Sequence, residues 1–357
     1  MTDSRTQVKL AGQRIRAGSD DVQDKEILQR WRARHIWVLN TFQANLRKYT
    51  AGTNIVVGQR LKRQPTIIDK LRREPRMQLT TMHDIAGCRV VFPNIDDLNS
   101  FRSKFNSLKF KHKRRTAERD QFNYIKRPKD TGYRGIHDVW EYASKSKKSK
   151  EYKGLLVEIQ YRTVFQHAWA TAIEVVDLIS NDRIKFNDAA SARMDFFRHA
   201  SEIIARAYED RKSCLSGLSN SELVSRFRFI EGSTGILATL KNLQLASHIQ
   251  NFGKNMILIF YYGRRGSAAI LEYESFNSTS KAERAYRELE FELAGQADVV
   301  MVSAKNFQSV REVFKNYFSD ATEFVKFVEL GMMRLVDPQP RFKFYYEMQG
   351  DRRSRRI

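Results

Sequence analysis

The chain of 357 residues contains only two cysteines and no long apolar run. Cys88 and Cys214 form no spaced set of metal ligands, and isolated thiols of this kind are typical of reduced, buried side chains in a cytoplasmic protein. No apolar stretch reaches the about 18 residues that a membrane-spanning helix needs, so we expect no membrane span. Residues 1–22 lack the apolar centre of a secretory signal, and we expect them to form a flexible N-terminal arm.

Acidic residues are scarce relative to basic ones. The chain carries 63 Lys and Arg against 41 Asp and Glu, a net charge of +22. Residues 101–153 hold 17 Lys and Arg against 6 Asp and Glu, so half of the excess lies in a seventh of the chain. A positive field of this size favours polyanions such as nucleotides, RNA or the ribosome. For the run KSKKSK at residues 145–150, a solvated turn between two strands is the simpler interpretation.

Apolar periodicity predicts an α/β domain over residues 23–215. Continuous apolar runs indicate buried strands, and apolar residues recurring every three or four positions indicate helices that pack on them. The expected strands cover 55–63, 85–92, 122–126, 135–143 and 154–162, and the expected helices cover 24–49, 66–74, 95–108, 164–179 and 189–212.

A second, smaller region is expected over residues 216–357. It begins with a small, polar stretch that is typical of a linker, followed by two helical patterns. Two apolar segments joined by GRRG (263–266) then predict a β-hairpin. An amphipathic helix that ends at Gly295, another strand and two more helices follow. This pattern predicts a small α+β domain, and the region contains no cluster of catalytic residue types.

Cations and carboxylates in the first domain are spaced for phosphate chemistry. Arg60 and Lys62 alternate along an extended segment and so share a face, and Lys70 lies on the helix that follows. Three cations close together suit a triphosphate. Asp84 directly precedes one buried strand, and Glu158 lies in the middle of another. Carboxylates from two strands can hold one Mg²⁺ that bridges phosphate groups.

A second set of polar residues follows on the neighbouring strands. Gln160 shares the face of Glu158 and would orient a hydroxyl nucleophile. Tyr133 follows a turn glycine, so its ring offers a stacking surface for a base. His137 lies further along the same strand, and Lys129 precedes the turn. Each of these residues alone is more often part of a core or a solvated surface, so the ordered combination is what indicates nucleotide chemistry.

This ordered set resembles the synthetase domain of the RelA/SpoT alarmone synthetases, over roughly residues 25–185. The resemblance implies a mixed β-sheet flanked by helices, similar to a nucleotidyltransferase core. It also implies that the 3′-hydroxyl of GDP or GTP attacks the β-phosphorus of ATP, with Mg²⁺ present, so that AMP leaves and (p)ppGpp forms. The implied ATP-binding residues are Arg60, Lys62, Thr66, Lys70 and Arg89. The implied acceptor-binding residues are Lys129, Tyr133, His137 and Arg162. The implied catalytic residues are Asp84, Glu158 and Gln160, of which Asp84 and Glu158 bind the metal.

The chain departs from the family pattern just before the loop that carries Lys129 and Tyr133. The family usually has a basic residue and an aspartate there, whereas the run 120–124 reads DQFNY, with Asn123 at the aspartate position and no basic residue. This departure at residues 120–124 leaves the identity of the acceptor open. The hydrolase domain of long family members is expected to be absent, because its His-Asp metal pattern is not found.

Two other hypotheses accompany the guanine acceptor. Compact relatives include toxins that pyrophosphorylate the 3′ end of tRNA or an adenine nucleotide. Some of them carry a fused C-terminal domain that restrains the toxin and senses phage proteins. By this resemblance, residues 216–357 would be regulatory and would bind a protein or a phage-derived ligand. The third hypothesis is an inactive nucleotide- or RNA-binding regulator, and the pair Asp84 and Glu158 argues against it, because a binding module has no need of two metal-binding carboxylates.

Overall fold

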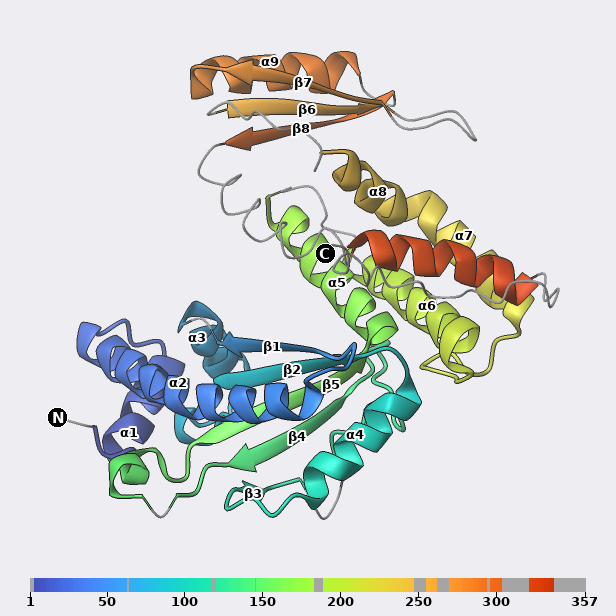
Figure 1. Ribbon diagram of the computed structural model, residues 1–357. Helices are drawn as coiled ribbons and strands as arrows, with labels where there is room; N and C mark the ends of the chain where they lie inside the picture. The colour runs from blue at the N-terminus through green and yellow to red at the C-terminus, as the bar shows by residue number, and fades with distance from the viewer. Residues whose placement is uncertain are drawn as a thin grey trace, which may run out of the picture.

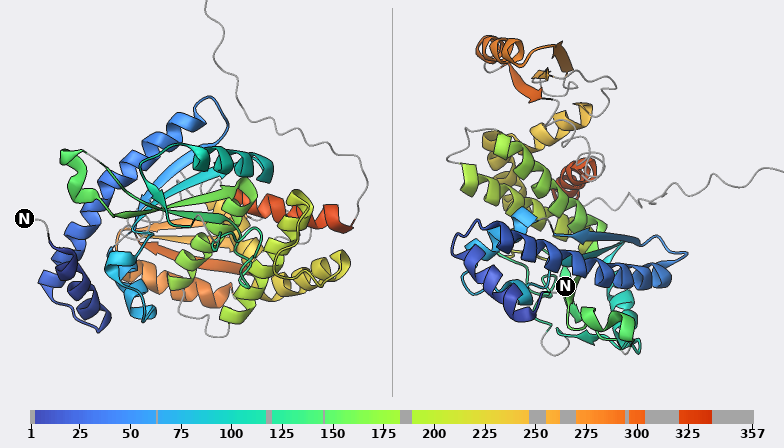
Figure 2. Two further views of the ribbon diagram at one scale, coloured as in Figure 1. Left: turned by 90° about the horizontal axis from the view of Figure 1, so that it is seen from below. Right: turned by 90° about the vertical axis from the view of Figure 1, so that its left-hand side faces the viewer.

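The chain folds into three successive parts (Figure 1). A large sheet with its helices forms one end, a layer of helices follows, and a small sheet forms the other end, as the perpendicular views in Figure 2 also show. This computed structural model describes residues 3–62, 64–116, 120–144, 146–182, 189–246, 255–261, 270–293, 296–303 and 321–336.

The large sheet is mixed, as expected. Its strand order is β1-β2-β5-β4-β3, where β2 and β5 run parallel and the other neighbours are antiparallel. The two central strands are apolar on their inward positions, which fits strands buried between other layers. The strands are β1 (Val56–Leu61), β2 (Ala86–Phe92), β3 (Lys113–Arg114), β4 (Ile136–Glu141) and β5 (Leu156–Thr163).

One face of this sheet carries the main hydrophobic core. Helices α2 (Val22–Thr50) and α4 (Ile95–Ser107) cover it, and their apolar stripes meet the inward side chains of β2, β5 and β4. Trp31 and Phe42 of α2 and Phe105 of α4 are almost fully buried there. Because strand side chains alternate between faces, the opposite face is left with the polar residues of the same strands.

The N-terminal segment differs from the flexible arm that we expected. Residues Arg5–Arg16 form helix α1, whose first turn is closed by a capping box between Ser4 and Gln7. Val8 and Ile15 point into the main core and are buried. A segment with so few apolar residues docks because those it has recur at helical spacing and therefore share one face.

The expected strand at residues 122–126 is absent, and a turn takes its place. Only an isolated bridge joins Asn123 to Ile136. Asp120 has a φ of 42°, and the Asn123 side chain accepts a hydrogen bond from the Lys126 backbone N–H at 3.1 Å. A side chain that bonds to the backbone three residues ahead competes with an extended strand, which explains the wrong prediction. Two short elements, α3 (Gln64–Arg73) and the 3₁₀ turn η1 (Leu79–Thr81), connect β1 to β2.

The middle layer is one helical core that crosses the expected domain boundary at residues 215 and 216. The Phe196 ring lies 5.1 Å from Phe227 and 6.4 Å from Phe324, so segments before and after the boundary share buried contacts. The helices are α5 (Val164–Asp182), α6 (Ala189–Glu209), α7 (Asn220–Thr234), α8 (Ile236–Ala246) and a helix over residues 321–336.

The small α+β unit at the other end agrees with the sequence. Its antiparallel sheet has the order β7-β6-β8, and α9 (Thr279–Glu292) packs against it through Ala285, Tyr286 and Leu289. The GRRG turn, Gly295 and the first of the two final helices fall outside the described residues. Among the helices described, none is long and apolar enough to cross a membrane. The strands are β6 (Asn255–Tyr261), β7 (Ile270–Phe276) and β8 (Ala297–Ser303).

The docking of α1 can be tested with one core variant and one surface variant. Ile15→Ala removes buried methyl groups and should lower the free energy of unfolding by about 2–4 kcal/mol, because the cavity is not refilled. Leu10→Ala, on the exposed side of the same helix, should change it by no more than about 0.5 kcal/mol. Denaturant unfolding followed by circular dichroism measures both, and equal effects would show that α1 is not docked.

Candidate active site

The polar face of the large sheet is organised by strand register. Gly87 of β2 pairs directly with Glu158 of β5, and Arg60 of β1 pairs with Gly87. Two residues further on, Gln160 of β5 lies opposite His137 of β4. Directly paired residues point to the same face, so these side chains all lie on the side away from α2 and α4.

Asp84 lies in the turn before β2, and two lysines hold its carboxylate. Lys62 Nζ donates to Asp84 Oδ2 at 2.9 Å, and Lys70 Nζ donates to the same oxygen at 3.0 Å. Burial would raise the pKa of Asp84, but the two ammonium groups outweigh burial and lower it to about 2. Asp84 Oδ1 is buried and has no hydrogen-bond partner among the described residues. The carboxylate is therefore ionised at neutral pH and has one coordinating oxygen to spare.

Glu158 lies in the middle of β5, almost fully buried, with the imidazole of His137 against it. His137 Nδ1 contacts Glu158 Oε1, and its Nε2 lies 2.5 Å from the Tyr133 hydroxyl oxygen. Burial alone would lower the pKa of His137, but Tyr133 and Glu158 together raise it. Burial likewise would raise the pKa of Glu158, and His137 lowers it. The protonated imidazole donates through both nitrogens and keeps Glu158 ionised.

The acceptor-side residues gather around the Tyr133 ring. Arg162 donates from one terminal nitrogen to the Tyr133 hydroxyl at 3.2 Å and to Gln160 Oε1 at 3.1 Å. Lys129 Nζ lies 5.4 Å from the centre of the same ring. Five predicted residues from β4, β5 and the loop before β4 thus form one connected group with Glu158.

Three predicted ATP-site residues stay outside these contacts. Arg60 is exposed on β1, on the same face as Glu158. Thr66 is partly buried in α3, the helix that carries Lys70. Arg89 lies on β2 and forms an ion pair with Glu174 of α5, with 3.6 Å between nitrogen and oxygen. This acidic partner could not be predicted from the sequence, because Arg89 and Glu174 lie on different elements.

Two aromatic side chains near the site were not anticipated as functional. The Tyr124 ring meets the rings of Tyr133 and His137 edge-on, at 5.7 and 5.5 Å between centres. His83 stacks on Phe122 with 5.6 Å between ring centres. A signal existed for both: His83 directly precedes Asp84, and Tyr124 ends the run DQFNY.

A cavity of about 360 Å³ lies on this face of the sheet, nearer than Glu158 to the start of β5. Val139, which pairs with Glu158 across the strands, lines the cavity. Leu156, two positions before Glu158 on β5, lines it as well. The other lining residues include Arg5, Phe122 and the ion pair of Arg115 with Glu141. A space of this size is within the range of small-ligand pockets.

Residues 59–176 match a family model described as a region found in RelA / SpoT proteins. These residues include the end of β1, all of β2, β4 and β5, and nearly all side chains described above. This segment of the chain belongs to the RelA/SpoT family. The family assignment made from the motifs alone is therefore confirmed.

Two curated proteins of Bacillus subtilis are among the relatives. The chain is 36% identical over 114 residues to the GTP pyrophosphokinase YjbM, covering 31% of this chain and 51% of that protein. It is 30% identical over 150 residues to the GTP pyrophosphokinase YwaC, covering 40% of this chain and 65% of that protein. The chain thus spans between about half and two thirds of the length of these two relatives.

Among solved structures, the small alarmone synthetase 1 of Bacillus subtilis bound to its product pppGpp aligns with half of this chain. The alignment covers 50% of this chain and 91% of that one, with 25% sequence identity and a TM-score of 0.41.

The lysines around Asp84 can be tested through its titration. Lys70→Met removes one of the two cations and should raise the pKa of Asp84 from about 2, because less positive charge then favours the carboxylate. Carbon-13 NMR titration of labelled aspartate side chains measures this shift. Lys104→Met, on the exposed side of α4, is the control and should leave the Asp84 titration in place. An unchanged titration in Lys70→Met would contradict the ion pairs.

Proposed function

We propose that this protein is an ATP-dependent pyrophosphokinase that transfers the β,γ-diphosphate of ATP to the 3′-hydroxyl of a guanine nucleotide. AMP leaves and (p)ppGpp forms. The observation that carries the proposal is a pair of ionised carboxylates, Asp84 and Glu158. Two lysines hold Asp84, and His137, which contacts Tyr133, holds Glu158. The names of the two Bacillus subtilis relatives support a guanine acceptor.

Mg²⁺ fits the donor set of this site. The free, buried Oδ1 of Asp84 and the carboxylate of Glu158 are hard oxygen donors, which Mg²⁺ prefers. No group of three or more His, Cys, Asp or Glu that could hold a metal occurs among the described residues. The remaining ligands would therefore be phosphate oxygens and water, as is usual for Mg²⁺ in phosphoryl transfer. When bound, the ion would neutralise part of the phosphate charge.

The two lysines at Asp84 would bind the phosphates of ATP. In the free protein they neutralise Asp84 at 2.9 and 3.0 Å, so they already lie where negative charge will be placed. Their ammonium groups would stabilise the negative charge that spreads over the transferred group in the transition state. Arg60 and Arg89, further along the same face, would hold the rest of ATP.

Glu158 and Gln160 would orient the attacking 3′-hydroxyl. The pKa of Glu158 is lowered, with burial opposing the shift and His137 causing it, so this carboxylate is a weak base. Metal binding and orientation of the hydroxyl therefore suit it better than removal of the proton before attack. Gln160 is fixed by Arg162, which limits the positions that its amide can take.

The acceptor base would stack on Tyr133, and the cavity lined by Val139 and Leu156 would take part of the remainder of the nucleotide. Arg162 and Lys129 lie 5.3 and 5.4 Å from the ring centre and add positive charge for a phosphate-bearing ligand. Arg5 and Arg115 line the cavity itself.

The reaction uses ATP and guanine nucleotides, so we assign the protein to the cytoplasm. Regulation by a protein or phage-derived ligand at residues 216–357 stays a prediction.

The reaction is tested with ATP labelled at the γ-phosphate and with GDP, GTP, ATP and deacylated tRNA offered separately in the presence of Mg²⁺. Label should appear in a guanine nucleotide, with AMP released in equal amount. Transfer to tRNA or to ATP alone would reject the guanine acceptor and support the toxin hypothesis. Transfer to none of the four would reject the proposed activity.

The metal-binding role predicts that Asp84→Asn and Glu158→Gln each lower the rate of transfer by at least about a thousandfold, because both remove a charged ligand without changing shape. Asp96→Asn, an exposed carboxylate in the first turn of α4, is the matched control and should keep the wild-type rate. Circular dichroism and thermal unfolding check that the variants fold. Substantial activity in either site variant would exclude its carboxylate as a metal ligand.

The stacking role predicts a split between the two substrates. Tyr133→Ala removes the ring and should raise the KM for the acceptor by about tenfold or more, with little change in the KM for ATP, because base stacking on an aromatic ring contributes about 1–3 kcal/mol. Tyr133→Phe keeps the ring and should retain most of the acceptor affinity. Steady-state kinetics with each substrate varied in turn measure both constants. An equal rise in the two KM values would contradict stacking.

A further inference from the structure

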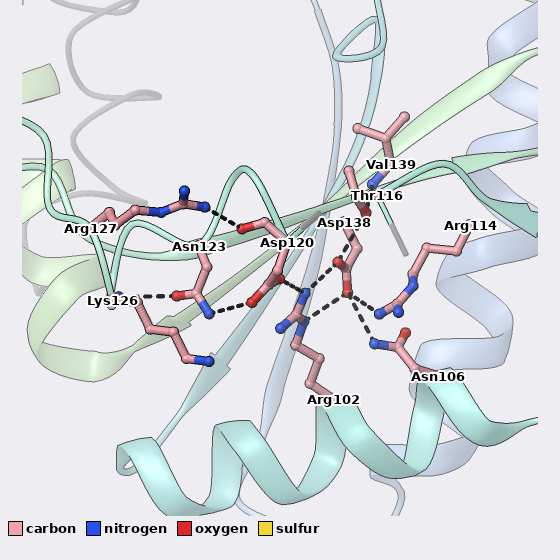
Figure 3. Close-up of polar contacts among 10 residues, drawn as sticks. All are labelled: Arg102, Asn106, Arg114, Thr116, Asp120, Asn123, Lys126, Arg127, Asp138 and Val139. Atoms are coloured by element: carbon pink, nitrogen blue, oxygen red, sulfur yellow. Dashed lines mark hydrogen bonds and ion pairs between the residues drawn. The ribbon is translucent and has the colours of Figure 1, made fainter. Parts of the chain in front are cut away.

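A buried charge network lies beneath the acceptor side of the site, on the opposite face of the sheet (Figure 3). Asp138 of β4 is completely buried and follows His137 directly, so its side chain points away from the site and towards α4. Arg102 of α4 donates to both of its oxygens, at 2.9 and 2.7 Å. Asn106 and Thr116 donate to the same carboxylate at 3.3 and 3.2 Å. A fully buried carboxylate is tolerated here because it is paired and hydrogen-bonded.

Arg102 also holds the loop that precedes the acceptor residues. One of its terminal nitrogens donates to Asp120 Oδ1 at 2.5 Å, so a single guanidinium joins β4, α4 and this loop. Burial would raise the pKa of Asp120, but the hydrogen bonds from Arg102 and Asn123 lower it. The loop is therefore anchored by an ionised carboxylate that is only partly buried.

Asn123 completes the anchor. Its amide nitrogen donates to Asp120 Oδ2 at 2.8 Å, and its oxygen accepts from the Lys126 backbone N–H at 3.1 Å. Arg127 donates to the Asp120 backbone oxygen at 2.9 Å. An aspartate at position 123 would place a second carboxylate against that of Asp120, so the amide is required by its neighbour.

The anchored loop contacts the site directly. The His137 backbone N–H donates to the Phe122 oxygen at 3.1 Å, and the Tyr124 backbone N–H donates to the Gly135 oxygen at 2.8 Å. The Tyr124 ring lies edge-on against both Tyr133 and His137. Movement of the loop would therefore move the stacking ring and the imidazole that holds Glu158.

We propose that Asp120 and Asn123 are positioning residues for the acceptor, acting through Arg102 on one side and through Tyr124 on the other. They do not touch the reacting atoms. They fix the loop over residues 120–127, which fixes Tyr133 and His137. The proposal rests on the proposed function, which supplies the acceptor, while the placement of His137 can be measured without any reaction.

The first test exchanges the two side chains. Asn123→Asp brings two carboxylates together and should raise the KM for the acceptor by roughly tenfold, the equivalent of about one lost hydrogen bond, with the KM for ATP unchanged. The double variant Asp120→Asn with Asn123→Asp restores an amide–carboxylate pair and should recover most of the acceptor affinity. Asp120→Asn alone leaves the Arg102–Asp138 pair intact, so it should fold and show an intermediate KM. Lys126→Ala, an exposed side chain in the same loop, is the matched control.

The second test uses the free protein. In Asn123→Asp, amide hydrogen exchange at His137 should become about tenfold faster, because the Phe122 carbonyl that accepts its hydrogen bond lies in the loosened loop. Exchange at Ile159, in the middle of β5, should stay the same. An unchanged acceptor KM or an equal rise in both KM values would overturn the proposal, as would unchanged exchange at His137. If the wild-type protein transfers pyrophosphate to no acceptor, the proposed function fails, and the exchange result alone decides whether the loop positions His137.

Discussion

The parallel pairing of β2 with β5 is the constraint on which the rest of the site depends. It sets Gly87 opposite Glu158 and Arg89 opposite Gln160, so residues about 70 positions apart in the chain share one face. Gly87 has no side chain, which leaves the space between Arg60 and Glu158 open on that face. A slip of one residue in this register would turn Glu158 and Gln160 into the hydrophobic core. The apolar residues that alternate with them prevent such a slip, because they fill the space under α2 and α4.

Each buried carboxylate around the site is matched by positive charge before any ligand binds. Asp84 has two lysines, Glu158 has His137, and Asp138 on the opposite face has Arg102. An unpaired buried carboxylate would be protonated or would destabilise the fold, so this pairing is what allows the charges to be kept inside. The same cations are then available where phosphate groups would be placed, at little cost in rearrangement. Stability and the proposed chemistry thus use the same side chains.

The C-terminal half contributes to the folded protein in two different ways. Helix α7 and residues 321–336 complete the core of α5 and α6, so they belong physically to the part of the chain that carries the site. The unit formed by β6, β7, β8 and α9 has a small core of its own. A binding role for residues 216–357 would therefore be sought in that unit, since the helices between are needed for packing. This division was not visible in the sequence, where residues 216–223 have the composition of a linker.

The sequence by itself determined most of the elements, the mixed sheet of the RelA/SpoT segment, and the residue types of the site. Periodicity and local motifs are properties of neighbouring residues, and they could be followed for α2, β2, β4, β5 and the residues around Tyr133. The tertiary structure alone decided contacts between distant segments. Arg102 and Asp120 lie on a helix and a turn, Arg89 finds Glu174 on another element, and α1 is ordered only because a core exists to receive Val8 and Ile15. The turn at residues 120–127 belongs to this second group. Its apolar and aromatic residues favour a strand. The hydrogen bonds of Asp120 with Arg102 and Asn123 hold it as a loop instead, and the bond with Arg102 forms only when α4 packs against the sheet.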